Sequence, residues 1–215
     1  MLEKLKITIL TDKTSWMNKY NMDLAQKLEE LGHCIKLINS KNKLHFGNIA
    51  FFLSCFEIID NDKLKLHKNN IVVHASKLPQ GKGWSPMSWQ ILECENIIPL
   101  TLFEANEKVD AGNIYVQDEI ILNGTELIDE WQNVLGEKIV EMCIFYVCNY
   151  KNIQPQNQVG EETFYKKRTP GDSELDANKT IKEQFNLLRI VDNENYPAFF
   201  EINNQKYKLK IEKYE

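Results

Sequence analysis

The stretch 70-NIVVHASKLPQGKGWSP-86 joins a run of β-branched apolar residues to a loop of small, basic and turn-forming residues. Residues 71–73 are typical of a strand that is buried on both faces, and His74 follows them directly. In open α/β sheets, ligands bind beyond the carboxyl ends of the strands. The position of His74 therefore makes it the first candidate for a functional residue.

The size and charge of the chain limit the kinds of partner. Its 215 residues, 43% of them apolar, are enough for one well-filled domain with a small appendage. The 26 Lys and Arg residues against 31 Asp and Glu residues give a net charge of −5. This balance weighs against binding to nucleic acid or to an anionic membrane surface. We therefore expect neither as a partner.

The cysteines and the amino-terminal residues indicate a reducing location. The five cysteines are an odd number without a CxxC pair, so they predict neither a disulfide framework nor a zinc site, and we expect mostly buried thiols. The stretch MLEKLKITIL interleaves charged with apolar residues, unlike a signal peptide. No apolar run reaches the ~18 residues of a membrane span. We interpret the chain as a cytoplasmic protein.

Strand-like and helix-like segments alternate along residues 1–150. This alternation predicts an α/β domain with a mostly parallel central sheet. Residues 151–162 are polar and are predicted to be a linker or an excursion, and residues 163–215 a small C-terminal α+β subdomain with a helix at 180–190 and a hairpin at 198–211. We expect strands at 6–10, 34–38, 49–53, 71–73, 98–103 and 113–122, and helices at 22–31, 87–93 and 126–150.

A second candidate functional residue comes from 110-DAG-112, which places a carboxylate just ahead of the strand at 113–122. A histidine and an aspartate delivered by strand ends can form an acid/base pair. A structural role for the histidine is the alternative. Phosphate-binding motifs are missing, because the sequence contains neither GxGxxG after the first strand nor GxxxxGK[ST]. A dinucleotide-dependent oxidoreductase or a P-loop enzyme is therefore disfavoured.

These residues carry a family resemblance. The run HASKLPQGKGWSP resembles the H-x-S-x-LP-x-x-x-G loop of the folate-dependent formyltransferases, and 110-DAGNIY-115, with Asp110 lying 36 residues after His74, is similar to their D-x-G segment. The resemblance covers residues 1–150 and implies a Rossmann-like formyltransferase domain. The segments YKKRTP (165–170) and YPAF (196–199) are similar to the region that follows the catalytic domain in methionyl-tRNA and sugar formyltransferases. The short sugar N-formyltransferases are the most similar group.

The resemblance implies transfer of a formyl group from 10-formyltetrahydrofolate to an amine, without a metal. His74 would donate to the oxyanion or move the proton, and Asp110 would tune it. Family members commonly carry an asparagine two residues before the histidine, where this chain has Val72. Lys77 is a candidate replacement for that donor, with a solvated loop lysine as the equally open alternative.

The kind of acceptor amine is inferred by excluding other members of the family that the chain resembles. Methionyl-tRNA formyltransferases need a basic RNA-binding C-terminal domain, whereas residues 163–215 are few and the net charge is negative. A sugar N-formyltransferase remains, acting on a nucleotide-linked amino sugar such as a UDP- or dTDP-4-amino sugar in surface-glycan biosynthesis. A non-catalytic binding module, or an enzyme acting on another small amine, stays open. A homodimer is possible.

The resemblance also suggests residues that bind the two ligands, with core packing or plain solvent exposure as the alternative at each. The folate group is expected to contact Phe52, Leu53, Ser54, Glu104, Ala105 and Val109. The sugar or its diphosphate is expected to contact Trp16, Asn18, Lys82, Trp84, Lys166, Lys167 and Arg168.

Overall fold

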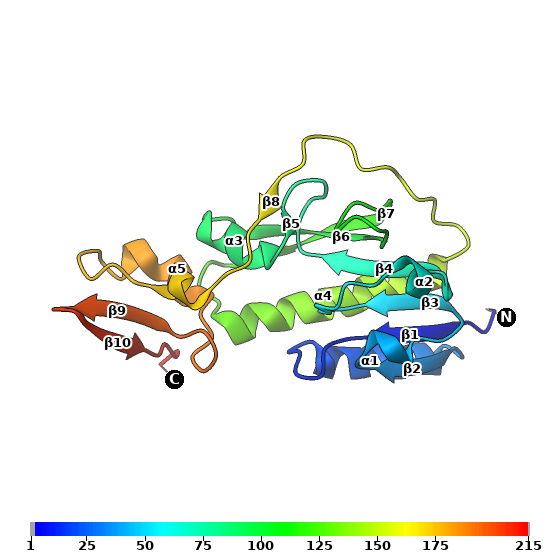
Figure 1. Cartoon of the computed structure of the whole chain (residues 1–215), viewed down its shortest axis with the longest axis horizontal. Helices are drawn as coiled ribbons and strands as arrows, with labels where there is room; N and C mark the ends of the chain where they lie inside the picture. Colours follow the sequence, from blue (N-terminus) through cyan, green and yellow to red (C-terminus); the bar gives the residue numbers. More distant parts are fainter. Residues whose placement is uncertain (1–2, 215) are drawn as a thin grey trace.

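A six-stranded sheet in the order β2-β1-β3-β4-β6-β7 forms the centre of the computed structural model, which describes residues 3–214 (Figure 1). Neighbouring strands from β2 to β4 run parallel, whereas β6 and β7 pair antiparallel at one edge. The predicted α/β class with a mostly parallel sheet is confirmed. The strands are β1 (Lys6–Leu10), β2 (Cys34–Ile38), β3 (Gly47–Phe52), β4 (His67–His74), β6 (Ile97–Glu104) and β7 (Ile114–Ile121).

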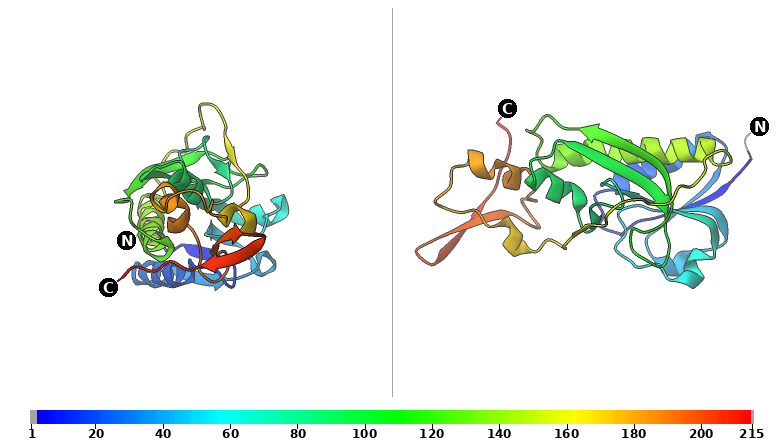
Figure 2. Two further views of the ribbon diagram at one scale, coloured as in Figure 1. Left: turned by 90° about the vertical axis from the view of Figure 1, so that its left-hand side faces the viewer. Right: turned by 90° about the horizontal axis from the view of Figure 1, so that it is seen from above.

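Helices α1 (Asn18–Glu30) and α4 (Ile128–Asn149) pack against one face of the sheet (Figure 2). Alternate strand residues such as Ile9, Phe51 and Ile71 meet helix residues such as Leu24 and Tyr146 there, all of them buried. The opposite face carries a smaller apolar cluster around Phe52, covered in part by the short helix α2 (Asn61–Leu64). The sheet is therefore covered unequally, with its main core under the long helices.

The expectation of mostly buried cysteines is wrong. Only Cys143, on the inner side of α4, is buried, and Cys55 is half-buried. Cys34 begins the edge strand β2, Cys94 follows α3 (Pro86–Leu92) with a φ of +70°, and Cys148 lies on the outer side of α4. Apolar composition around a cysteine does not show which side of an element it occupies, and three of the five thiols are exposed.

The residues after α4 return along the sheet before they form the C-terminal part. We call residues 151–165 the strap: Gln156 bridges to Ile114, and β8 (Phe164–Tyr165) pairs with β5 (Lys82–Gly83). Figure 1 shows the strap as the long yellow-green connection above the sheet. Beyond it lie the 3-10 helices η2 (Pro170–Ser173) and η3 (Lys182–Gln184), the helix α5 (Phe185–Arg189), and a hairpin of β9 (Ala198–Ile202) and β10 (Gln205–Leu209).

A buried arginine joins this C-terminal part to the main core. The guanidinium of Arg189 is fully buried and donates to the side chains of Asn96, Glu126 and Asn186. The indole N–H of Trp131 donates to the Arg189 carbonyl at 3.0 Å. We call this group the Arg189 clasp, and it ties α5 to the start of α4. Across residues 3–214, no helix has the length and apolar character needed to cross a membrane.

Candidate active site

His74 ends β4 and is buried beneath the loop that follows it. Its Nε2 atom lies 2.8 Å from the Gly81 carbonyl oxygen and 3.8 Å from Oδ2 of Asp110. A carbonyl oxygen can only accept, so this contact requires the proton on Nε2. The structure thus brings together the two residues that the sequence singled out, with the imidazole N–H pointing between a carbonyl and a carboxylate.

Asp110 is held in place by contacts from three segments. It has a φ of +52°, and its Oδ2 accepts a hydrogen bond of 2.8 Å from the Gly83 N–H. The side-chain amide of Gln158 donates to the carbonyls of Asp110 and Gly112, at 2.9 and 2.8 Å. A Cβ on Gly112 would lie 1.6 Å from the Glu104 carbonyl oxygen, so only glycine fits there. The carboxylate is therefore fixed before any ligand binds.

The strap also holds the loop after His74. The Gly81 N–H donates to Thr163 Oγ1 at 2.8 Å, and the buried ammonium of Lys82 pairs with Glu162 at 2.6 Å. Gly83 has a φ of +96°, and a Cβ there would meet the Tyr165 carbonyl oxygen at 2.5 Å. The glycines of the loop thus allow close backbone contact with the strap. Lys82, expected at the sugar or diphosphate, has its ammonium engaged with Glu162.

Val72 and Lys77 flank His74 in different environments. Val72 is two residues before His74 on the same face of β4, and it packs against the apolar cluster around Phe52. No polar side chain therefore stands where formyltransferases commonly have an asparagine. Lys77 is exposed, and its side chain makes no hydrogen bond or ion pair with any residue from 3 to 214. Its ammonium group is free to turn toward a ligand.

The residues expected at the folate group are spread along the sheet. Phe52 and Leu53 are buried on opposite faces, and Ser54 turns the chain with a φ of +51°. Val109 is exposed, directly before Asp110. Glu104 and Ala105 lie beside Ile71 and Asn70, about 10 Å along the strand from the His74 pairing position.

Glu104 is engaged in a different network. Its carboxylate accepts hydrogen bonds from the Asn69 amide, the Asn70 N–H and the Tyr115 hydroxyl. These partners lie toward the amino end of β4. The structure therefore does not bring Glu104 to the His74–Asp110 pair.

Two of the residues expected at the sugar form an aromatic and basic rim next to this pair. Trp84 follows Gly83 and stacks on Phe56, with ring centroids 5.4 Å apart, while Lys167 Nζ lies 4.6 Å from the centre of the Trp84 ring. Phe56 is 69% exposed, so one side of this stack faces solvent. The rim offers a ring surface and a cation beside Asp110. The sequence did not indicate Phe56, because an isolated aromatic residue in a loop carries no periodic signal.

The other expected substrate residues have structural partners. Trp16 packs edge-on against Tyr20, and the Asn18 amide donates to the carbonyls of residues 12 and 13. Lys166 pairs with Asp172 at 2.8 Å, and Arg168 donates to the Ile190 and Asp172 carbonyls. Gln158 and Thr163 were missed by sequence reasoning, because the strap has no hydrophobic period that would place it against the loop. Within residues 3–214, no group of three or more His, Cys, Asp or Glu side chains could hold a metal ion.

Comparison with known proteins supports the resemblance at the level of sequence. Residues 39–142, which include His74 and Asp110, match a family model described as formyl transferase. The methionyl-tRNA formyltransferase of Mycoplasma capricolum is 29% identical over 178 residues, covering 80% of this chain and 55% of the relative. The chain thus spans about half the length of the curated relatives it matches.

Solved structures show the same fold. A methionyl-tRNA formyltransferase from Clostridium thermocellum has a TM-score of 0.82 at 21% identity, covering 98% of this chain and 94% of that one. HypX from Aquifex aeolicus in complex with tetrahydrofolic acid has a TM-score of 0.81 at 17% identity, covering 97% and 38%. A 4-N formyltransferase from Francisella tularensis has a TM-score of 0.71 at 19% identity, covering 98% of each. The resemblance indicated by the loop at 74–86 is thus confirmed, and this chain has the fold of the formyl transferases together with a match to their family model.

Proposed function

We propose that the chain is a folate-dependent N-formyltransferase that moves a formyl group from 10-formyltetrahydrofolate to an amine. The observation that carries the proposal is the His74–Asp110 pair, buried at the carboxyl end of β4 and inside the residues that match the formyl transferase model. Neither side chain has a competing structural ion pair within residues 3–214. Their geometry suits proton transfer at this end of the sheet.

The surface beside the pair fits a planar donor molecule. Phe56 and Val109 are 69% and 61% exposed. Phe56 stacks on Trp84, the residue after Gly83, whose N–H donates to the Asp110 carboxylate, and Val109 directly precedes Asp110. These apolar side chains, with the backbone groups of the 105–109 loop, would hold the folate. 10-Formyltetrahydrofolate, when bound, supplies the formyl group. The chain contributes position, an N–H donor and a carboxylate.

His74 performs the proton chemistry in this proposal. Its Nε2–H, now donating to the Gly81 carbonyl, would exchange that hydrogen bond for the oxygen or nitrogen of the reacting group. To take up the proton that the attacking amine loses, the imidazole would carry its own hydrogen on Nδ1, so that Nε2 accepts the amine proton. Asp110 would then stabilise the resulting imidazolium, because its carboxylate lies 3.8 Å from Nε2. Lys77 is proposed as the donor that replaces the asparagine absent at Val72, since its exposed ammonium sits three residues after His74.

For the acceptor we infer a nucleotide-linked amino sugar, such as a UDP- or dTDP-4-amino sugar of surface-glycan biosynthesis. Three observations support it: the fold shared with 4-N and other sugar N-formyltransferases, the Trp84–Lys167 rim beside the pair, and the negative net charge. An aromatic ring and a cation suit a nucleobase and a phosphate. The sequence relatives named methionyl-tRNA formyltransferase make tRNA the acceptor to test against it.

One assay separates these acceptors. Purified protein is mixed with 10-formyltetrahydrofolate and either a panel of 4-amino-sugar nucleotides or charged initiator tRNA, and both tetrahydrofolate release and product mass are measured. Release with a sugar nucleotide, together with a product heavier by one formyl group, is the expected result. Formylation of the tRNA alone contradicts the proposed sugar acceptor but still supports N-formyltransferase activity. His74→Asn protein controls for a contaminating enzyme.

A non-catalytic binding module is the second candidate, because Val72 places a hydrocarbon side chain where the reaction commonly has an amide. Such a module would bind tetrahydrofolate and yield no product with any acceptor. Calorimetric titration with tetrahydrofolate alongside the assay distinguishes the two candidates. Binding without turnover across the whole panel favours the module.

A further inference from the structure

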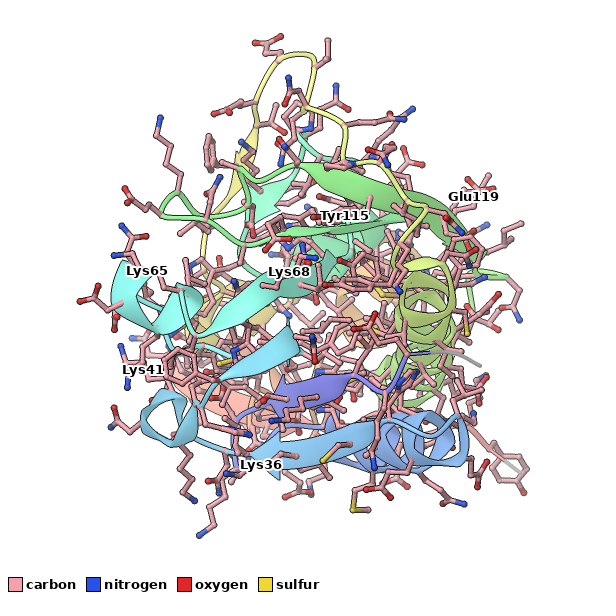
Figure 3. The ribbon with its side chains drawn as sticks, turned by 90° about the vertical axis from the view of Figure 1, so that its right-hand side faces the viewer. Lys36, Lys41, Lys65, Lys68, Tyr115 and Glu119 are labelled. Carbon is pink, nitrogen blue, oxygen red and sulfur yellow. The ribbon has the colours of Figure 1, made fainter. Side chains whose placement is uncertain are left out.

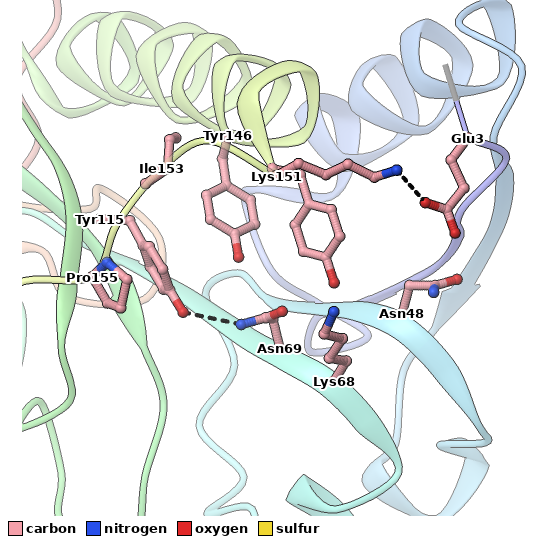
Figure 4. A pocket seen from close by; sticks show the side chains of 10 residues that line it. Glu3, Asn48, Lys68, Asn69, Tyr115, Tyr146, Lys151, Ile153 and Pro155 are labelled. Atoms are coloured by element: carbon pink, nitrogen blue, oxygen red, sulfur yellow. Dashed lines mark hydrogen bonds and ion pairs between the residues drawn. The ribbon is translucent and has the colours of Figure 1, made fainter. Parts of the chain in front are cut away.

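A cavity of about 460 Å³ opens at the amino ends of β3 and β4, where β7 and the carboxyl end of α4 close it (Figures 3 and 4). We call it the tyrosine cavity, because Tyr115, Tyr146 and Tyr150 line it. A neighbouring hollow of about 370 Å³ shares Lys68 and Tyr115 with it. Lys68 is six residues before His74 on β4, which corresponds to about 20 Å. The cavity is therefore separate from the candidate active site.

One wall of the tyrosine cavity is formed by the three tyrosine rings, while the charged side chains of Glu3, Lys68 and Lys151 lie elsewhere around it. The rings of Tyr115 and Tyr146 meet edge to face with centroids 5.0 Å apart, and those of Tyr146 and Tyr150 with centroids 6.0 Å apart. Burial raises the pKa of all three phenols above the ordinary value, so each keeps its O–H at neutral pH. Edge-to-face contact is the arrangement that aromatic rings favour. A flat ring of matching size therefore suits this wall.

The donors around the cavity are incompletely used. The Tyr150 hydroxyl is buried and has no hydrogen-bond partner among residues 3–214. Lys68 Nζ lies 5.6 Å from the centre of the Tyr150 ring and makes no ion pair with residues 3–214, and Figure 4 shows its ammonium pointing into the cavity. A buried hydroxyl without a partner costs free energy, which a ligand oxygen would recover. Both the Lys68 ammonium and the Tyr150 hydroxyl can therefore donate a hydrogen bond to a ligand.

The carboxylates that line the two hollows are already compensated. Glu3 pairs with Lys151 at 2.8 Å. Glu104 accepts from the Asn69 amide and from the Tyr115 hydroxyl, each at 2.9 Å. Lys68 makes no ion pair within residues 3–214. The charge of Lys68 also helps to lower the pKa of the Glu3 carboxylate, but that carboxylate is already paired with Lys151, so Lys68 can attract a further anion.

We propose that the tyrosine cavity is a binding site for small aromatic carboxylates. The ring of the ligand packs against Tyr115 and Tyr146, and its carboxylate accepts from the Lys68 ammonium and the Tyr150 hydroxyl. A volume of this size lies in the usual range of small-molecule sites, which combine apolar walls with a few polar groups. The site does not depend on formyl transfer, because no residue of the candidate active site lines it.

Benzoate is the probe, with neutral benzamide as its isosteric control, titrated into the full chain by NMR or calorimetry. We expect saturable benzoate binding with a Kd of about 1 mM or lower, and benzamide weaker by about tenfold or more. Lys68→Met should weaken benzoate by about tenfold, and Tyr150→Phe by about fivefold, since each removes one donor. Lys65→Met is the matched control and should bind like wild type, because Lys65 is paired with Asp62 outside the cavity.

Folding is checked on the same samples by circular dichroism, and the exposed position of Lys68 makes its substitution mild. Benzoate binding that is absent, that is equal for benzamide, or that survives Lys68→Met in folded protein overturns the proposal. Tetrahydrofolate release measured on these variants tests the other site, so failure at one leaves the other standing.

Discussion

Strand β4 begins with His67 and ends with His74, and the two histidines are buried in different surroundings. His67 contacts the Thr8 hydroxyl at 2.9 Å and faces the His45 ring, and its Nδ1 atom has no hydrogen-bond partner in the described part of the chain. His74 lies between a carbonyl and the Asp110 carboxylate. Burial therefore does not distinguish the two. The difference lies in the neighbours: His74 faces a carboxylate, whereas burial and the nearby His45 lower the pKa of His67 and keep its imidazole neutral.

The largest expected effect comes from removing either member of the carboxyl-end pair. His74→Asn and Asp110→Asn should each lower kcat by about 100-fold or more, because acid/base catalysis is lost. The measurement is tetrahydrofolate release by folded protein. His67→Gln is the matched control at the other end of the strand, and its kcat should stay near wild type. Normal activity of the His74→Asn enzyme would contradict a catalytic role for His74 and leave no functional difference between the two histidines of β4.

The second prediction concerns the pH dependence of stability at the amino end. Burial, with a smaller contribution from His45, lowers the pKa of His67 from 6.5 to about 4. Between these values the unfolded chain binds the proton and the folded chain does not, so stability falls as pH drops through this window. The stability lost across this window is about 3 kcal/mol. Denaturant unfolding from pH 7 to pH 4 should show a shallower loss in His67→Gln than in wild type, and equal slopes would contradict the assignment.

The third prediction tests the strap as a positioning device. Gln158→Ala should lower kcat by about 30-fold with a smaller change in KM, because Asp110 loses the amide that fixes its backbone. Gln156→Ala is the matched control, since the Gln156 side chain is exposed and its bridge to Ile114 uses only the backbone. Gln158→Asn, with the same amide on a shorter chain, should recover less than wild type. Equal activity of the Gln158→Ala and Gln156→Ala variants would leave Asp110 held by Gly83 alone.

The smallest expected effect belongs to Lys77. If its ammonium supports the developing oxyanion, Lys77→Met should lower kcat by about tenfold while the affinities for folate and sugar change little. Val72→Asn in that background should restore part of the rate, although a buried amide without partners costs about 1–3 kcal/mol. A raised KM with unchanged kcat would instead assign Lys77 to phosphate binding, and unaltered kinetics would make it a plain surface residue.

Much of the fold follows from local patterns. The expected strands at 6–10 and 34–38 match β1 and β2, and the Asn203–Asn204 turn has positive φ at both residues, as a tight hairpin requires. β4 is longer than the apolar run 71–73, because His67 and Asn69 find polar partners across the sheet. β6 runs antiparallel to both of its neighbours, β4 and β7. This direction depends on pairing between distant residues, and no periodicity in the strand encodes it.

Only those residues of the candidate site that lie in sequence motifs could be predicted. His74 and Asp110 stand in recognisable segments, and the structure brings them within 3.8 Å. The groups that hold these two residues in place belong to no recognisable motif. Gln158 acts through a side-chain amide on backbone carbonyls, and the Gly81 carbonyl acts through the backbone itself. A sequence pattern records residue types at fixed spacing, so contacts between a polar strap and a carbonyl leave no mark in it.

The Arg189 clasp constrains how this protein could be recombined with its relatives. The guanidinium is 1% exposed, and its acceptors come from the segment before β6, the turn before α4 and α5 itself. A chimera that imports a foreign C-terminal part while keeping Asn96 and Glu126 would bury those acceptors without their donor, at a cost of several kcal/mol. In a domain exchange, all three segments therefore have to come from the same parent protein. Joining two parents within the strap, which connects the sheet domain to the C-terminal part, would separate Arg189 from two of its acceptors.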